Sequence, residues 1–312
     1  MRTQPPVRPE PRTHTLDAAP SLVPLLARGA LLSPFKRPRP DARVPATRLL
    51  LSGVRIDLAH LAAYERVCGF ATGADALPVT YPHVLAFPLA MRILAGRAFP
   101  LPLLGLVHTS IEITRHRECA ANAEYELAVL VEKLAPHRRG TEATVLTEAR
   151  VHGTPVWESR STYLARHSPR NPGKEPTRDP TPGNPLPQVP APAPAPRQDS
   201  RTLPALAEWR LGPDVGRRYG AVSGDRNPIH LHPLTARLFG FPRAIAHGMW
   251  TVARCLAEYG PGQAVEVRAE FRAPVPLPGT VTYAARGPEF ELRSGGRIHL
   301  TGDVRPTRPR DA

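Results

Sequence analysis

The sequence predicts an α+β protein of two similar units in tandem, each an antiparallel sheet wrapped around one long central helix. Three observations predict it. A proline-rich stretch divides the chain, each half contains one long apolar helical pattern, and segments of alternating hydrophobicity follow that pattern in both halves. A helix that is apolar on most sides must be enclosed, and two such units can pair their exposed sheet edges. This arrangement is the tandem, or double, hot-dog fold.

The dividing stretch is residues 168–200, in which eleven of 33 positions are proline. Proline removes a backbone donor and keeps its predecessor out of the helical region, so a semi-extended linker is predicted. We interpret it as a passive spacer rather than a docking motif for a proline-binding module. The expected division is a Pro/Arg-rich segment with a short docking helix at 21–33 (1–44), a degenerate hot-dog unit (45–167), the linker (168–200), a catalytic hot-dog unit (201–306) and a tail (307–312).

In the N-terminal unit, residues 81–94 (YPHVLAFPLAMRIL) carry apolar side chains at helical spacing and predict the central helix. Residues 105–116 (GLVHTSIEITRH) alternate like a strand, and residues 123–134 (AEYELAVLVEKL) follow them. Residues 141–166 predict two strands joined across a Gly-Thr-Pro turn.

The C-terminal unit repeats this order. Residues 245–259 (IAHGMWTVARCLAEY) predict the helix and residues 264–275 (AVEVRAEFRAPV) an alternating strand, with further strands in 279–292 and 295–304. Setting the strand at 105–116 against the strand at 264–275 gives a constant offset of 158, which pairs Val107 with Val265 and Ile113 with Phe271. The repeat is weak in identity but supports two related units.

The net charge of +14 lies mostly outside the two units. Residues 1–48 hold nine basic side chains against three acidic ones, and residues 166–201 hold six against three, so these segments supply +9 of it. We therefore infer no nucleic-acid partner from the charge. The modest positive excess that remains suits a small molecule that bears phosphate.

The chain shows no sign of membrane insertion or export. No apolar run approaches the roughly 18 residues of a membrane span, and residues 1–17 lack the apolar region of a secretory signal. The three cysteines, Cys68, Cys119 and Cys255, match neither a metal cluster nor a disulfide framework. A cytoplasmic location is expected.

Residues 223–230 (SGDRNPIH) place Asp225 and His230 five residues apart around the Asn227-Pro228 turn. A carboxylate and an imidazole that meet in this way can hold one water molecule between them. If one group takes a proton from the water and the other returns a proton to the same face of a substrate, the result is syn addition of water. The residues leave open which of the two donates. Alone, Asp225 would equally suit an Asx turn and His230 a structural role, but their occurrence together favours catalysis.

His247 and Gly248, in the segment AHGM, stand at the start of the predicted C-terminal helix. Backbone amides there have no partner within the helix, and the helix dipole is positive at this end. Because glycine lets a carbonyl approach closely, the N–H of Gly248 is the predicted donor to negative charge that builds on a substrate oxygen.

Residues 219–250 (YGAVSGDRNPIHLHPLTARLFGFPRAIAHGMW) resemble the hydratase motif of the MaoC-like dehydratases, the R-specific (type 2) enoyl-CoA hydratases. The first half is similar to the noncatalytic N-terminal hot-dog of two-domain members, so the resemblance covers most of residues 20–305. It implies that Asp225 and His230 are the catalytic pair and that Gly248 is the oxyanion donor. The substrate-binding positions that it implies are Asn227, His247, Ser223, Tyr219 and Met249.

Two features depart from a fully active tandem. Many members carry a serine on the core helix, eight residues after the motif glycine, that helps to hold the catalytic water. This chain has Leu256 there, so weaker binding of that water is expected. The first half has no counterpart of the Asp–His turn, and its His83 stands loosely opposite His247 without a carboxylate. We expect one active site per chain, with the N-terminal unit supplying the partner sheet and the acyl pocket. His108 and His116 are interpreted as structural.

The predicted activity is that of an R-specific enoyl-CoA hydratase, equally a (3R)-hydroxyacyl-CoA dehydratase, which adds water reversibly to trans-2-enoyl thioesters in fatty-acyl metabolism. The expected partner is an acyl-CoA or acyl-carrier-protein thioester. We expect no metal, no redox cofactor, no nucleic acid and no membrane span. The tandem fold forms a pseudo-dimer within one chain and leaves a homodimer open.

Two alternatives remain at this stage. A hot-dog thioesterase would cleave the thioester, but such enzymes do not usually carry the Asp-Asn-Pro-His turn. A non-catalytic acyl-CoA-binding or scaffold subunit is favoured by Leu256 and by the charged tails.

Overall fold

The structure, a computed structural model, describes residues 11–36, 42–167, 203–260, 262 and 264–307. The strands are β1 (Arg12–Leu16), β2 (Thr47–Arg55), β3 (Leu106–Arg115), β4 (Glu124–His137), β5 (Gly140–Val151), β6 (Thr154–Arg166), β7 (Ala205–Leu211), β8 (Val265–Phe271), β9 (Gly279–Arg286), β10 (Glu289–Ser294) and β11 (Arg297–Pro306). The helices are α1 (Leu22–Leu32), η1 (Ser33–Phe35), α2 (Leu58–Cys68), α3 (Tyr81–Leu94), α4 (Val215–Ser223), α5 (Pro228–Leu231), α6 (Pro233–Leu238) and α7 (Gly248–Tyr259).

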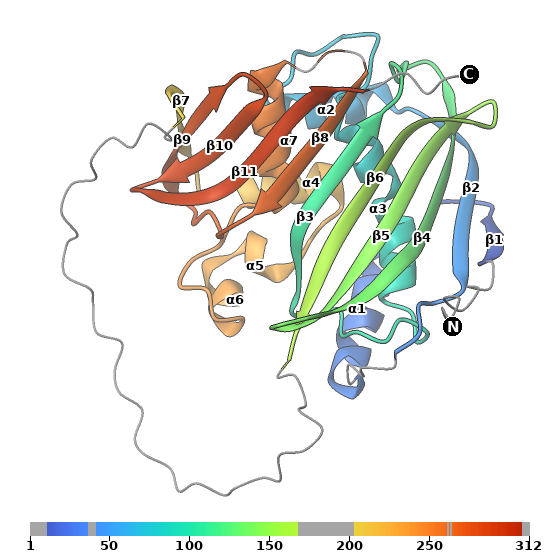
Figure 1. Ribbon diagram of the computed structural model, residues 1–312. Coiled ribbons are helices and arrows are strands. Elements are labelled where there is room, and N and C mark those ends of the chain that lie inside the picture. The colour runs from blue at the N-terminus through green and yellow to red at the C-terminus, as the bar shows by residue number, and fades with distance from the viewer. Residues whose placement is uncertain (1–10, 37–41, 168–202, 261, 263, 308–312) are drawn as a thin grey trace, which may run out of the picture.

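Within the described part, all strands belong to one 11-stranded sheet of order β1-β2-β4-β5-β6-β3-β8-β11-β10-β9-β7. The two units meet where β3 and β8 pair antiparallel, with Ile111 opposite Ala269. The two central helices lie on the same face of the sheet, α3 behind the N-terminal strands and α7 behind the C-terminal ones (Figure 1). The predicted tandem hot-dog fold is confirmed. The offset of 158 also relates Ile111 to Ala269, as expected for edges that face each other across a pseudo-two-fold axis.

The central helices form because their apolar positions can be enclosed by the sheet. Helix α3 spans the predicted residues 81–94, and its Leu89 and Leu94 are completely buried. Helix α7 begins at Gly248, three residues after the predicted start at 245. The preceding residues are extended because their backbone pairs with another segment: Ala246 N–H donates to Val275 O at 2.9 Å, and Leu277 N–H donates to Ala244 O at 2.8 Å.

The strand predictions are also close to the structure. Strand β8 ends at Phe271 rather than at 275, and the segment 279–292 forms the two strands β9 and β10. The predicted linker, 168–200, lies outside the described residues. Among the helices of the described part, none is both long enough and apolar enough to cross a membrane.

Helix α1, from the N-terminal segment, lies against α3 (Figure 1). Gly29 lets α1 approach the segment that follows α3, because a Cβ there would lie 2.3 Å from Leu103 Cδ2 and 3.1 Å from Ala95 Cβ. Ser33 Oγ donates to Gly29 O at 2.7 Å and accepts from Leu104 N–H at 2.9 Å, which fastens the end of the helix. At the other end of α1, Leu22 packs against Gly224, where an added Cβ would lie 2.3 Å from Leu22 Cδ1. Helix α1 therefore contacts the turn that follows α4.

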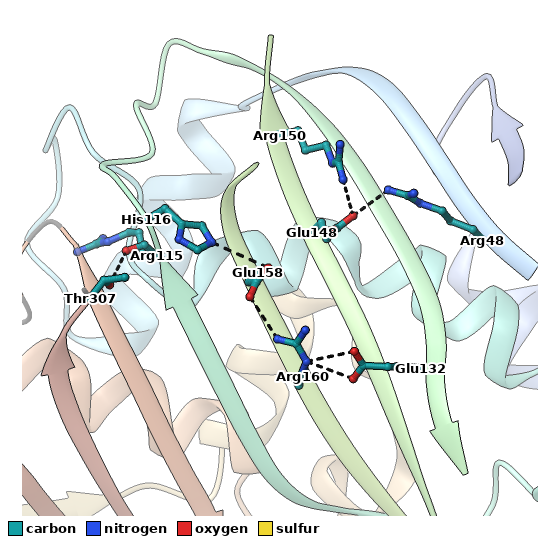
Figure 2. Close-up of polar contacts among 9 residues, drawn as sticks. All are labelled: Arg48, Arg115, His116, Glu132, Glu148, Arg150, Glu158, Arg160 and Thr307. Atoms are coloured by element: carbon teal, nitrogen blue, oxygen red, sulfur yellow. Dashed lines mark hydrogen bonds and ion pairs between the residues drawn. The ribbon is translucent and has the colours of Figure 1, made fainter. Parts of the chain in front are cut away.

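The outward face of the N-terminal sheet carries ion pairs both between strands and within single strands (Figure 2). They are Arg48–Glu148 (2.8 Å), Arg150–Glu148 (3.1 Å), Arg160–Glu132 (3.2 Å) and Arg160–Glu158 (3.2 Å). His116 Nε2 lies 3.9 Å from Glu158 on the same face, so this histidine points away from the central helices. Partly exposed pairs of this kind stabilise a fold by about 0–1 kcal/mol each.

Candidate active site

Three segments of the C-terminal unit bring a carboxylate and two imidazoles together. Asp225 follows α4, which ends at Gly224 in the left-handed conformation (φ +75°). His230 lies in the short helix α5, and His247 caps the N-terminus of α7. One polar atom from each of the three side chains lies within 4.8 Å of the others. These residues also form a possible ligand set for a divalent cation.

The Asp225 turn is held by its own side chains. Asp225 N–H donates to Ser223 Oγ at 3.2 Å, Asn227 N–H to Asp225 Oδ1 at 3.2 Å, and Ile229 N–H to Asn227 Oδ1 at 3.3 Å. The Asx turn that was weighed against catalysis is therefore present, but it uses one carboxylate oxygen. The other, Oδ2, lies 3.9 Å from His247 Nε2. Asp225 can hold the turn and still present a free oxygen.

His230 is fixed in one tautomer by a backbone carbonyl. Its Nδ1 lies 2.8 Å from Ile245 O, and Ile245 N–H in turn donates to Ile229 O at 3.1 Å. A carbonyl oxygen can only accept, so Nδ1 carries the proton and Nε2 of the neutral ring keeps its lone pair. Burial lowers the pKa of His230, while Asp225 and the Ile245 carbonyl act in the opposite direction. The neutral ring is thus prepared to accept a proton at Nε2.

His247 is oriented the other way round. Its Nε2 lies 2.8 Å from the backbone oxygen of Asp225, so Nε2 carries the proton. Its Nδ1 is buried and has no hydrogen-bond partner among the described residues. The rings of His247 and His230 are stacked with centroids 3.7 Å apart. Burial, followed by the neighbouring His230, lowers the pKa of His247 to about 3.

Gly248 is also constrained by packing, which the sequence did not predict. A Cβ on Gly248 would lie 2.8 Å from Cε1 of Phe271 in β8, so an aromatic ring fills the space that we expected a carbonyl to need. As the first residue of α7, Gly248 still has an N–H without a partner inside the helix. The oxyanion role of Gly248 stays a prediction, and it rests on this N–H rather than on the missing side chain.

The other predicted residues pack around this centre. Tyr219 is 2% exposed, and its ring centroid lies 4.9 Å from that of His247, so it both fills the core and lines the site. Met249 lies in the first turn of α7 and is buried. Leu256 is completely buried in the core and adds no polar group to the site.

Comparison with known proteins identifies the family. Residues 191–293 match the model described as "MaoC like domain". A 3-hydroxyacyl-thioester dehydratase X of Mycobacterium tuberculosis is 36% identical over 276 residues, which cover 86% of this chain and 92% of that protein. The chain belongs to the MaoC-like dehydratase family. It is an enzyme of the hydro-lyase class.

Solved structures agree with this assignment. The crystal structure of HtdX of Mycobacterium tuberculosis superimposes with a TM-score of 0.68 at 34% identity, over 83% of this chain and all of that one. A MaoC-like dehydratase from Phytophthora capsici gives a TM-score of 0.64 at 16% identity, over 86% of this chain and 96% of that one, which shows the fold alone.

A cleft of about 450 Å³ opens beside the Asp225 turn of this MaoC-like dehydratase. Its lining residues are Leu22, Val23, Leu26, Ala221, Gly224 and Arg226. Two of these flank Asp225 in the chain, and Asp225 itself is 31% exposed. Helix α1, which lies outside both predicted hot-dog units, therefore forms one wall of the approach to Asp225.

Residues of the N-terminal unit that sequence reasoning missed also adjoin the site. His108 of β3 stacks on Tyr163 of β6, with centroids 4.5 Å apart, and lies 4.8 Å from Phe271, the ring that covers Gly248. His108 was interpreted as structural, and that interpretation stays a prediction; the structure places it on the helix side of the sheet, near the first residue of α7. The sequence carried no signal for this placement.

The histidines around the site predict that this MaoC-like dehydratase is sensitive to acid. Burial lowers the pKa of His83 to about 4 and the pKa values of His108 and His247 to about 3. An unfolded chain has histidine pKa values near 6.5, so it binds more protons than the fold as the pH drops below that value. Stability that is present above pH 6.5 is therefore lost as the pH falls toward the folded values. Each histidine contributes a loss of about 2 kcal/mol at pH 5.

Urea unfolding at pH 7.5 and pH 5 measures this loss. We expect a much lower midpoint at pH 5 and a smaller pH dependence in His108→Phe, which keeps an aromatic ring against Tyr163. Equal midpoints at the two pH values would show that the histidines are not held neutral by the fold.

Proposed function

We propose that the chain is an R-specific enoyl-CoA hydratase, and in reverse a (3R)-hydroxyacyl thioester dehydratase, with Asp225, His230 and Gly248 as its catalytic residues. The observation that carries the proposal is the approach of the Asp225 carboxylate to the His230 ring, with polar atoms within 4.8 Å. A water molecule that makes two hydrogen bonds of about 2.8 Å at a tetrahedral angle spans about 4.6 Å. The two groups are therefore spaced to hold one water.

In the hydration direction the water oxygen bonds to C3 of the enoyl thioester while one of its protons passes to His230 Nε2. The electron pair of the C2–C3 double bond shifts so that negative charge develops on the thioester oxygen, where the Gly248 N–H stabilises it. The imidazolium then returns the proton to C2 on the same face, which completes syn addition. Because burial lowers the pKa of His230, its imidazolium is a stronger acid than a free imidazolium, which favours this step. Dehydration follows the same path in reverse.

The charge of Asp225 has a separate task. Its carboxylate raises the pKa of His230 against the effect of burial, so it stabilises the imidazolium while the proton is in transit. The tautomer set by Ile245 supports His230 as the base, with Asp225 orienting the water. We therefore propose His230 as the group that takes and returns the proton, a choice that the residues alone left open.

Two further observations support an acyl thioester as the substrate. The relative from Mycobacterium tuberculosis is named a 3-hydroxyacyl-thioester dehydratase. The cleft beside Asp225 is lined by apolar side chains and one cation, Arg226, which suits an apolar chain better than a polar one. Three of the apolar lining residues, Leu22, Val23 and Leu26, come from α1.

The proposal is tested with crotonyl-, octenoyl- and hexadecenoyl-CoA. We expect loss of the enone absorbance with at least one of them, an (R)-3-hydroxyacyl product on chiral analysis, and the same rate in the presence of EDTA. Release of free thiol would instead identify a thioesterase, and binding without turnover would identify a scaffold subunit. An (S) product would contradict the assigned face of addition. Loss of turnover in EDTA would instead indicate that Asp225, His230 and His247 bind a metal ion.

A further inference from the structure

Polar atoms without partners gather where the N-terminal unit meets the active site. Among the described residues, Nδ1 of His83, Nε2 of His108 and Nδ1 of His247 are buried and make no hydrogen bond. The rings of His83 and His108 are nearly parallel with centroids 6.2 Å apart, and His108 contacts Phe271, whose ring covers the first residue of α7. The three atoms therefore belong to one neighbourhood that joins the two units.

Buried polar atoms without partners lower the stability of the fold. A buried polar atom without a partner destabilises a protein by about 1–3 kcal/mol, and buried polar groups are in general satisfied. Partnerless atoms that gather beside a catalytic turn indicate that a polar ligand completes them. His83 is well suited to contact one, since its side chain is 8% exposed and it lies in the first turn of α3.

The charge of Asp225 links His83 to the reaction centre. Asp225 raises the pKa of His83 against the larger effect of burial, and it also raises the pKa of Tyr163, on which His108 is stacked. Both residues belong to the N-terminal unit, whereas Asp225 belongs to the other. Their side chains thus lie within the electrostatic reach of the catalytic carboxylate.

We propose that His83 is a substrate-positioning residue, whose imidazole hydrogen-bonds an oxygen of the acyl thioester on the side of the site opposite Asp225. The inference rests on the proposed function and deepens it. His108 and Tyr163 hold the site wall beside the His83 ring. The N-terminal unit is then more than a partner sheet and acyl pocket, because it supplies a polar contact that the Asp225–His230 turn lacks.

The test compares His83→Phe, which keeps a ring and removes both nitrogens, with His299→Phe. His299 is a matched control because it is also a buried histidine whose Nδ1 has no hydrogen-bond partner among the described residues, but it lies in β11 and its Nε2 bonds to Ser294 Oγ at 2.6 Å. We expect His83→Phe to lower kcat/KM for crotonyl-CoA about 10- to 100-fold and to weaken binding of butyryl-CoA, a saturated analogue, about as much. His299→Phe should lower the unfolding midpoint without changing either value.

Two polar replacements, His83→Asn and His83→Gln, separate a loss of substrate positioning from a loss of folding. Asn places an amide near the position of Nδ1 and Gln places one near that of Nε2, so a residue that positions substrate through one nitrogen is rescued by one of them. We expect His83→Asn and His83→Gln to differ at least about tenfold in butyryl-CoA affinity. Equal values for these two variants, or wild-type values for His83→Phe, would overturn the proposal. A wild-type protein without turnover would defeat the proposed function instead.

Discussion

Replacing Asp225 with Asn is expected to lower kcat for crotonyl-CoA by about 10³-fold and to leave the fold intact. The amide oxygen of Asn can still accept the Asn227 N–H that now bonds to Asp225 Oδ1, so the turn keeps its shape. The negative charge that raises the pKa of His230 is lost, and the imidazolium formed during the reaction is no longer stabilised. Steady-state kinetics, with urea unfolding of the same sample, measures both effects.

Asp57→Asn provides the matched control. Asp57 Oδ1 also accepts backbone N–H groups, from Ala59 at 2.9 Å and His60 at 3.1 Å, where it caps α2. The same change of charge there should leave kcat within about twofold of wild type. If Asp225→Asn turned over at the wild-type rate, the carboxylate would be a turn cap alone, and the proposed mechanism would fail.

The parts of the molecule that the sequence predicted well are those set by neighbours in the chain. The helix at 81–94 and the strand at 105–116 follow from the spacing of apolar residues, and each lies within a residue or so of its expected bounds. The Asp225–His230 turn is equally local, since side-chain bonds between positions two residues apart hold it. A short sequence therefore contains the information for this centre.

The inward placement of His108 could not be predicted, because it depends on a break in the alternation of β3. Ile111 and Ile113 of β3 point toward the central helix, so strict alternation would send His108 to the outer face. The register of β3 against β6 shifts between His108 and Ser110, which leaves an extra residue on β3. This bulge turns His108 to the inner face, opposite Tyr163. Nothing in the alternation of the residues marks the shift.

The packing contact that excludes a side chain at Gly248 was missed for a similar reason. Its neighbour Phe271 stands 23 positions later, on the strand that forms the junction between the units, and the two meet only once the sheet encloses α7. Local reasoning gave the helix terminus and its unpaired amide. The packing partner that forbids a side chain there is a tertiary contact, which residue spacing cannot supply.

Substitutions of the two stacked histidines, His230 and His247, are expected to lower kcat to very different extents. His230→Asn keeps an amide that can donate to Ile245 O, as Nδ1 does now, but it has no counterpart of Nε2. We expect kcat to fall about 10³-fold, because the base that accepts the proton of water is gone. His247→Gln keeps a donor for the backbone oxygen of Asp225 and should lower kcat by about tenfold at most. The difference follows from the tautomers: His230 turns a lone pair toward the water, whereas the protonated nitrogen of His247 is engaged with the backbone.

The pH dependence gives the same distinction without relying on the size of a rate. A base must be neutral to act, and the pKa of His230 is lowered, so wild-type kcat/KM should stay level as the pH falls through 6.5 and should decline at lower pH, in the range where the protein remains folded. That decline should be absent in the residual activity of His230→Asn and present in His247→Gln. If His247→Gln were instead the variant that loses both the rate and the decline, the base would be His247. The hydrogen bond from His230 to Ile245 would then serve to hold the turn.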